Sequence, residues 1–73
     1  MWIVPTYEAA VYNRLVRDAL RRGDKNETGL DDEWENTRYV EVAAPDPDQA
    51  AARIERRYPE KLGFVLAGLK ETS

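Results

Sequence analysis

The residues best suited to binding or chemistry lie together in one acidic segment, residues 24–36. This segment holds six acidic residues and one basic residue, a local net charge of −5 in a chain whose net charge is −3. Clustered carboxylates on a small domain can imitate nucleic-acid phosphates and bind a basic groove of another protein. Trp34, between two glutamates, would supply an aromatic anchor for such an interface. We therefore expect partner binding through Asp24, Glu27, Asp31, Asp32, Glu33, Trp34 and Glu35.

Trp34 also has a structural interpretation, as part of the folded core. Leu30 and Trp34 are four residues apart, so a short helical turn would place both on one side. A tryptophan in a small domain is usually packed, because its ring buries much apolar surface. We expect the ring to close over the core as a lid, and one exposed edge would leave it available to a partner as well.

The same segment resembles the EF-hand calcium loop over residues 24–35. Oxygen-bearing side chains occupy ligand positions around Gly29, and a glutamate stands at the twelfth position, where a bidentate carboxylate closes the shell. Two features depart from the pattern: Asp31 stands where an apolar residue is usual, and the segment leads into a strand instead of a helix. A calcium-binding module is therefore an alternative function, with the ligands Asp24, Asn26, Thr28, Asp32 and Glu35.

Arginines form a second charged feature of the chain. Arg14, Arg17 and Arg21 recur at helical spacing, as do Arg53 and Arg57. Such rows can contact nucleic-acid phosphates, but interleaved acidic residues also fit an ordinary salt-bridged helix surface. Weak nucleic-acid binding is a further alternative.

Catalysis is the function that the composition favours least. The chain has no Cys and no His, and its only serine is Ser73. These absences exclude thiol nucleophiles, imidazole bases, Cys/His zinc sites and disulfides. The four glycines are scattered, so no phosphate-cradling loop is present. We expect a non-enzymatic protein with no catalytic residue and no cofactor.

The first half of the chain predicts a strand and a helix. Residues 1–4 are apolar and end at Pro5, as in a short strand. Thr6 is a good N-cap, and apolar residues follow it at helical spacing, which predicts a helix over residues 7–22 with Gly23 just beyond its end. The apolar side of this helix would hold Tyr12, and its opposite side would hold Asn13.

The second half predicts a strand, a helix and a strand. Residues 37–43 alternate, with Val40 and Val42 facing inward. Asp46 is an N-cap followed by Pro47, and the helix that begins there ends before Pro59. Residues 62–69 are almost continuously apolar and predict the most buried strand.

This order, β-α-β-α-β, predicts a single small α/β (α+β) domain over residues 1–73. The expected architecture is a two-layer sandwich, a three-stranded sheet with two helices on one face. The other face would carry Tyr39, and with it Phe64 and Trp2, uncovered, which invites a protein partner or a homodimer. No apolar run reaches the roughly 18 residues of a membrane helix, and no signal sequence begins the chain, so we expect a cytoplasmic protein without membrane contact.

A small, cysteine-free acidic chain with its charge concentrated beside a tryptophan resembles the proteins carried by phages and mobile elements, of which the anti-CRISPR proteins are a well-known group. That group has no common fold or motif, so the resemblance is at the level of class and assigns no residue. It implies a stoichiometric inhibitor in a bacterial host, which binds a large nucleoprotein defence complex and blocks its DNA-binding surface.

Overall fold

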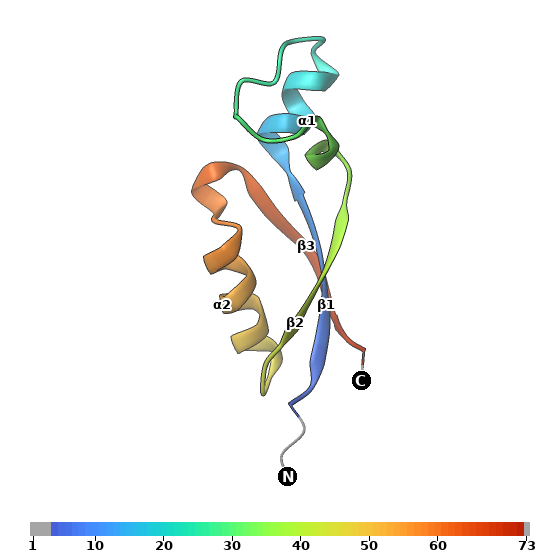
Figure 1. Ribbon diagram of the computed structural model, residues 1–73, viewed down its shortest axis with the longest axis vertical. Helices are drawn as coiled ribbons and strands as arrows, with labels where there is room; N and C mark the ends of the chain where they lie inside the picture. The colour runs from blue at the N-terminus through green and yellow to red at the C-terminus, as the bar shows by residue number, and fades with distance from the viewer. Residues whose placement is uncertain (1–3, 73) are drawn as a thin grey trace.

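The computed structural model describes residues 4–72 and shows an elongated α+β fold with extents of 51 × 19 × 15 Å (Figure 1). A three-stranded antiparallel sheet combines with two α-helices in the order β-α-β-α-β, which confirms the predicted fold class. The elements are β1 (Thr6–Asn13), α1 (Arg14–Arg21), the 3-10 helix η1 (Asp32–Glu35), β2 (Arg38–Ala43), α2 (Pro47–Arg57), the 3-10 helix η2 (Glu60–Leu62) and β3 (Phe64–Glu71).

The strand order in the sheet is β2-β1-β3, and β1 is antiparallel to both neighbours. Because both outer strands run opposite to β1, they run parallel to each other. Parallel strands need a crossover connection, and α2 provides it. The predicted strand–helix–strand unit is therefore present in a split form, with β1 between its two strands.

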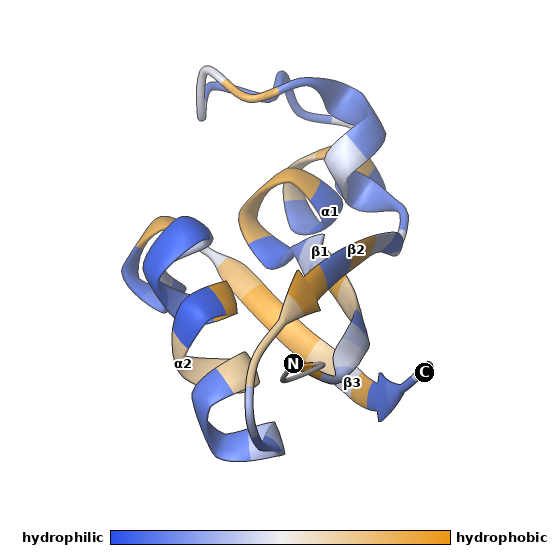
Figure 2. Cartoon of the chain, turned by 60° about the horizontal axis from the view of Figure 1, so that its bottom comes forward, coloured by the Kyte–Doolittle hydropathy of each residue, from blue (hydrophilic) through white to orange (hydrophobic). Residues whose placement is uncertain are grey.

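The helix α2 covers one face of the sheet, while α1 continues from β1 beyond the end of the sheet (Figure 1). Both helices were expected to cover one face of the sheet; α2 lies there, whereas α1 lies beyond the end of the sheet. The strands are largely hydrophobic, and much of α2 and of the acidic segment is hydrophilic (Figure 2). The apolar core between α2 and the sheet consists of Tyr7, Ala9, Val11, Val42, Ala44, Ala50, Ile54 and Phe64.

The helix predicted over residues 7–22 is wrong in its first half, since residues 6–13 form β1 and only residues 14–21 are α-helical. Thr6 is the first residue of β1 and not a helix cap. Tyr7, Ala9, Val11 and Asn13 are buried in strict alternation, which is the period of a strand. The apolar positions fitted a helical period as well, and pairing with two neighbouring strands decided in favour of the strand.

The prediction that residues 62–69 form the most buried strand is also wrong. β3 is an edge strand, and most of its residues are half-buried or exposed. β1 is the most buried strand because it lies between the other two. Of the strand predicted at residues 1–4, residues 1–3 lie outside the described residues, and Val4 is exposed and precedes β1.

The predictions for β2 and α2 are confirmed. Val42 is buried and Val40 half-buried on the side of β2 that faces α2. The Asp46 side chain accepts a hydrogen bond from the Gln49 amide at 2.8 Å, and Pro47 begins the helix. The start of α2 could be predicted because a helix cap involves only residues within one turn and no contact distant in sequence.

Candidate protein-interaction site

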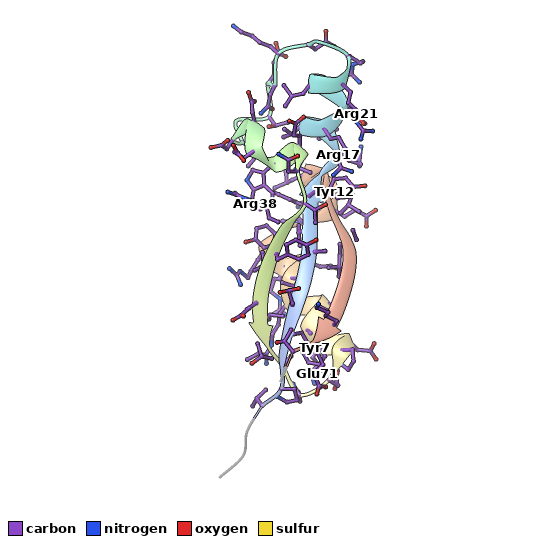
Figure 3. The ribbon with its side chains drawn as sticks, turned by 90° about the vertical axis from the view of Figure 1, so that its right-hand side faces the viewer. Tyr7, Tyr12, Arg17, Arg21, Arg38 and Glu71 are labelled. Carbon is purple, nitrogen blue, oxygen red and sulfur yellow. The ribbon has the colours of Figure 1, made fainter. Side chains whose placement is uncertain are left out.

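The acidic segment folds back onto α1 at one end of the molecule (Figure 1). We call residues 14–36 the lobe, and the sheet with α2 the body. Arg17 ties the two sides of the lobe together, since its Nε donates to the Glu35 carbonyl oxygen at 2.8 Å. Its guanidinium also lies 3.6 Å from the ring centre of Tyr12, at the end of the sheet (Figure 3). One arginine thus fixes the segment relative to both α1 and β1.

The loop between α1 and η1 is ordered by Asn26. Its Nδ2 donates to the Leu30 carbonyl oxygen at 2.7 Å and to Asp32 Oδ1 at 2.9 Å. Its Oδ1 accepts from the Thr28 hydroxyl at 2.6 Å and the Thr28 amide at 3.1 Å. Gly29 then turns the chain at a φ of 83°, a value that glycine adopts readily. These bonds hold the carboxylates on a defined backbone and not on a free coil.

The six carboxylates of the segment divide into two groups of three. Asp24 pairs with Arg22 at 3.0 Å, Asp31 accepts from the Glu33 amide, and Asp32 accepts from Asn26. The other three side chains make no hydrogen bond and no ion pair with residues 4–72. They are those of Glu27, Glu33 and Glu35, of which the first two are exposed and the third half-buried.

Trp34 is half-buried and packs against the core, as the lid interpretation predicts. Its ring meets Phe64 edge-on at 5.1 Å between centroids and Tyr58 at 5.4 Å. Tyr58 and Phe64 also contact each other, at 5.3 Å, so the three rings form one cluster from η1, α2 and β3. Arg38 lies over the Trp34 ring at 4.9 Å. Trp34 therefore joins the lobe to the body. These contacts cover part of the ring surface that a partner would otherwise contact.

Four of the five side chains of the calcium interpretation already take part in hydrogen bonds or an ion pair within the lobe. Asn26 and Thr28, two of the five ligands, hydrogen-bond to each other, and Asp24 points to Arg22. Within residues 4–72 no three acidic side chains come together in a group that could hold a metal ion. The geometry thus gives the calcium alternative no support.

Several arginines of the proposed phosphate-binding rows have structural roles. Arg17 is held by Glu35 and Tyr12, as described above. Arg53 donates from Nη1 to the Ala43 carbonyl oxygen, and Arg57 lies over the Tyr58 ring at 5.5 Å. In each row, at least one guanidinium group is therefore already engaged within the protein and is not free to contact phosphates.

Sequence reasoning missed Asn13, which it placed on a solvent-facing side of a helix. Asn13 is fully buried and is the N-cap of α1, because its Oδ1 accepts from the amides of Leu15 and Val16 at 3.0 and 3.1 Å. Its Nδ2 donates to the Leu62 carbonyl oxygen at 3.0 Å, 49 residues away in sequence. The alternation from Tyr7 to Asn13 was the signal that could have found it.

The sheet face opposite α2 is open, and the predicted exposure of Tyr39 is confirmed. The placement of Phe64 on this face is wrong, because Phe64 pairs with the buried Asn13 and lies in the core. Trp2 lies outside the described residues. Tyr12, which was expected in the core, lies on this open face, because it alternates with the buried Val11 and Asn13. Glu8 and Ala10 share this face for the same reason. The helix predicted over residues 7–22 gave no indication that Glu8, Ala10 and Tyr12 belong to this face.

No protein-family model matches the chain, and no curated protein or solved structure matches it. Among residues 4–72, no helix is long and apolar enough to cross a membrane. The acidic segment and the open sheet face are therefore the two candidate surfaces for binding.

Proposed function

We propose that this protein is a non-enzymatic interaction module whose acidic segment binds a basic surface of another protein. The observation that carries the proposal is the set of unpaired carboxylates of Glu27, Glu33 and Glu35 on a segment whose backbone is fixed. A surface that is ordered before it binds loses little conformational entropy on binding. Opposite charge on the partner would then contribute to association rate and specificity.

In its most specific form, the proposal is a phage-type inhibitor that occupies the nucleic-acid groove of a host nucleoprotein complex, as anti-CRISPR proteins do. Carboxylates spaced along an elongated surface can compete with phosphates for the same basic side chains. The unpaired carboxylates supply that negative charge, and the packing of Trp34 against Phe64 anchors the 3-10 helix that bears Glu33 and Glu35.

The test is affinity capture from nuclease-treated bacterial lysate with the tagged full chain and two charge variants. The first variant is Glu27→Lys, Glu33→Lys and Glu35→Lys, which leaves the hydrogen-bonded Asp31 and Asp32 intact. The second makes the same change in net charge on the body, at the exposed Asp48, Glu55 and Glu60. Circular dichroism confirms that both variants fold.

We expect one dominant protein to be captured by the wild type and the body variant and lost with the lobe variant. The captured protein should also lose its binding to DNA when the wild-type chain is added, which tests the more specific form. Equal capture by all three chains would contradict the proposal. Capture that appears only with calcium and disappears with a chelator would favour the metal alternative instead.

A further inference from the structure

Between Thr6 and Tyr12 of β1, the open face of the sheet carries two adjacent central rows, each made of one residue from each strand. In the first row Ala10 of β1 lies between Tyr39 of β2 and Gly68 of β3. In the second row Glu8 lies between Glu41 and Lys70. Figure 3 views the molecule from this side, with the three strands in front of α2.

The first row is asymmetric in size. Tyr39 is 69% exposed, so its ring is not packed flat against the neighbouring strands. Next to it the small residues Ala10 and Gly68 leave a hollow of about 300 Å³, one wall of which is Tyr39 itself. The backbone does not require glycine at position 68, because its φ is not positive and an added Cβ would approach Ala10 Cβ only to 3.8 Å. A large side chain at one edge thus stands beside an unfilled hollow at the other.

The second row is asymmetric in charge. Lys70 Nζ lies 3.7 Å from Glu8 Oε1, while Glu41 at the opposite edge has no ion-pair partner among residues 4–72. Glu8 and Glu41 are direct neighbours across the ladder, and like charges in this position repel. Glu41 is therefore a carboxylate that an additional cation would stabilise.

We infer that a second copy of this chain packs face to face on the open sheet, with the two-fold axis along β1. Such a rotation keeps the strand direction and exchanges the two edges of the sheet, so β2 of one copy lies over β3 of the other. Tyr39 then faces the partner's Gly68 and fills its hollow, and this happens twice. Glu41 faces the partner's Lys70, and this ion pair also forms twice.

Both rows become complementary under the same operation, and this coincidence identifies a second copy as the occupant. A two-fold interface must be self-complementary, with each patch matching its own image. Glu8 lies on the axis opposite its own copy, which costs energy, and the flanking lysines offset part of that cost. The Glu8 side chain thus provides a position at which the dimer can be strengthened.

The contact is small. Three strands, of eight, six and eight residues and about 4.8 Å apart, give a face of roughly 15 by 25 Å. This lies below the standard interface size, so we expect a weak dimer with a dissociation constant of about 10–100 µM. The inference concerns the body and does not depend on the function proposed for the lobe.

Sedimentation equilibrium of the full chain over a concentration series, up to about ten times the expected dissociation constant, tests the inference. The average mass should rise from 8.4 kDa towards twice that value. Gly68→Gln fills the hollow with a side chain that ends in a polar amide and should raise the dissociation constant about tenfold. Ala52→Gln, on the exposed side of α2, is the matched control and should leave it unchanged.

A charge exchange tests the arrangement itself. Glu41→Lys alone places two lysines opposite each other, and Lys70→Glu alone places two glutamates opposite each other, so each should weaken the dimer about tenfold. The double exchange should restore wild-type affinity to within about threefold, because Glu8 keeps one lysine neighbour in either arrangement. Glu8→Gln should strengthen the dimer, since it removes the repulsion on the axis.

Three results would overturn the inference. One is a mass that stays at 8.4 kDa throughout the series. Another is a dimer that is indifferent to Gly68→Gln, which would indicate pairing through a strand edge or through the lobe. The last is a double exchange as weak as the single changes, which would show that Glu41 and Lys70 do not face each other.

Discussion

The body and the lobe are stabilised by different interactions. In the body, apolar side chains of β1, β2 and α2 bury one another, and the fully buried Ile54 lies at the centre. In the lobe, only Val16 and Ala19 are buried, and both lie outside the main apolar cluster. Hydrogen bonds of Arg17 and Asn26 organise the remainder. A short chain can thus hold a charged surface in a defined arrangement with little apolar burial, provided that side chains hydrogen-bond to its backbone.

The two regions meet at a polar joint. Asn13 donates to the Leu62 carbonyl oxygen, and the Arg14 amide donates to the Gly63 carbonyl oxygen at 2.8 Å. Trp34 adds an apolar contact to this joint through Phe64. Substitutions in the body, at the joint and in the lobe should therefore have graded effects, the largest in the body.

The largest effect is expected for Ile54→Ala, which removes the central side chain of the body. Ile54 is 1% exposed, so the substitution leaves a cavity and should lower the free energy of unfolding by about 3 kcal/mol. In a domain of this size, such a loss unfolds much of the population. Urea denaturation followed by circular dichroism measures it, with Leu62→Ala as the control at an exposed position. Equal effects of the two changes would contradict the apolar origin of body stability.

Asn13→Ala should be the next most damaging change, at about 2–3 kcal/mol, since it removes a cap and leaves buried backbone groups without partners. Asp46→Ala removes the exposed cap of α2 and should cost only about 1 kcal/mol. Hydrogen exchange should show that Asn13→Ala releases the amides of α1 before those of β1. Simultaneous loss of both would mean that the lobe and the body unfold as one unit.

Gly63→Ala at the joint and Gly29→Ala in the lobe compare the two regions, since both glycines have a positive φ. An added Cβ at Gly63 would lie 2.7 Å from Leu15 Cγ and 2.8 Å from Asn13 Oδ1, so we expect a loss of about 2 kcal/mol. At Gly29 nothing lies within 4 Å, and Gly29→Ala should cost about 1 kcal/mol from backbone strain alone. The midpoints of thermal unfolding of the two variants measure the difference. A larger effect at Gly29 would show that the lobe is the more tightly packed region.

The smallest effect is a pH dependence in the body. Burial raises the pKa of the Tyr7 hydroxyl above its ordinary value of 10.0, and the negative charges of Glu71 and Asp46 and a hydrogen bond with Glu71 act in the same direction. Above pH 10 the unfolded chain therefore loses this proton while the folded chain keeps it. The resulting stabilisation is complete below pH 10 and is lost as the pH rises through the folded pKa.

Urea midpoints measured between pH 8 and pH 11 check this prediction. Tyr7→Phe should lose less stability over the range than the wild type, while Tyr39→Phe, at an exposed position, should follow the wild type. Figure 3 shows Tyr7 near Glu71 at the end of the body remote from the lobe. An unchanged slope in Tyr7→Phe would place the alkaline sensitivity elsewhere.

Where local chemistry was sufficient, the sequence determined the structure. The start of α2 follows from Asp46 and Pro47, whose effects act within one helical turn. The alternation of β2 and the lid role of Trp34 also followed from spacing, as did the β-α-β order of the second half of the chain. The concentration of carboxylates in residues 24–36 needed only the sequence, although which of them stay unpaired did not.

Three features depend on the assembled sheet: residues 7–13 form a strand, Asn13 is buried, and β1 contributes residues to both faces of the sheet. The apolar positions of this segment suit both a helix and a strand, and only pairing with β2 and β3 favours the strand. Asn13 finds its partner 49 residues away, a contact that no local pattern encodes. The rows of Tyr39 with Gly68 and of Glu41 with Lys70 also exist only after β1 brings two distant strands together. The register between two strands determines which of their residues are neighbours, and register is a property of the assembled sheet.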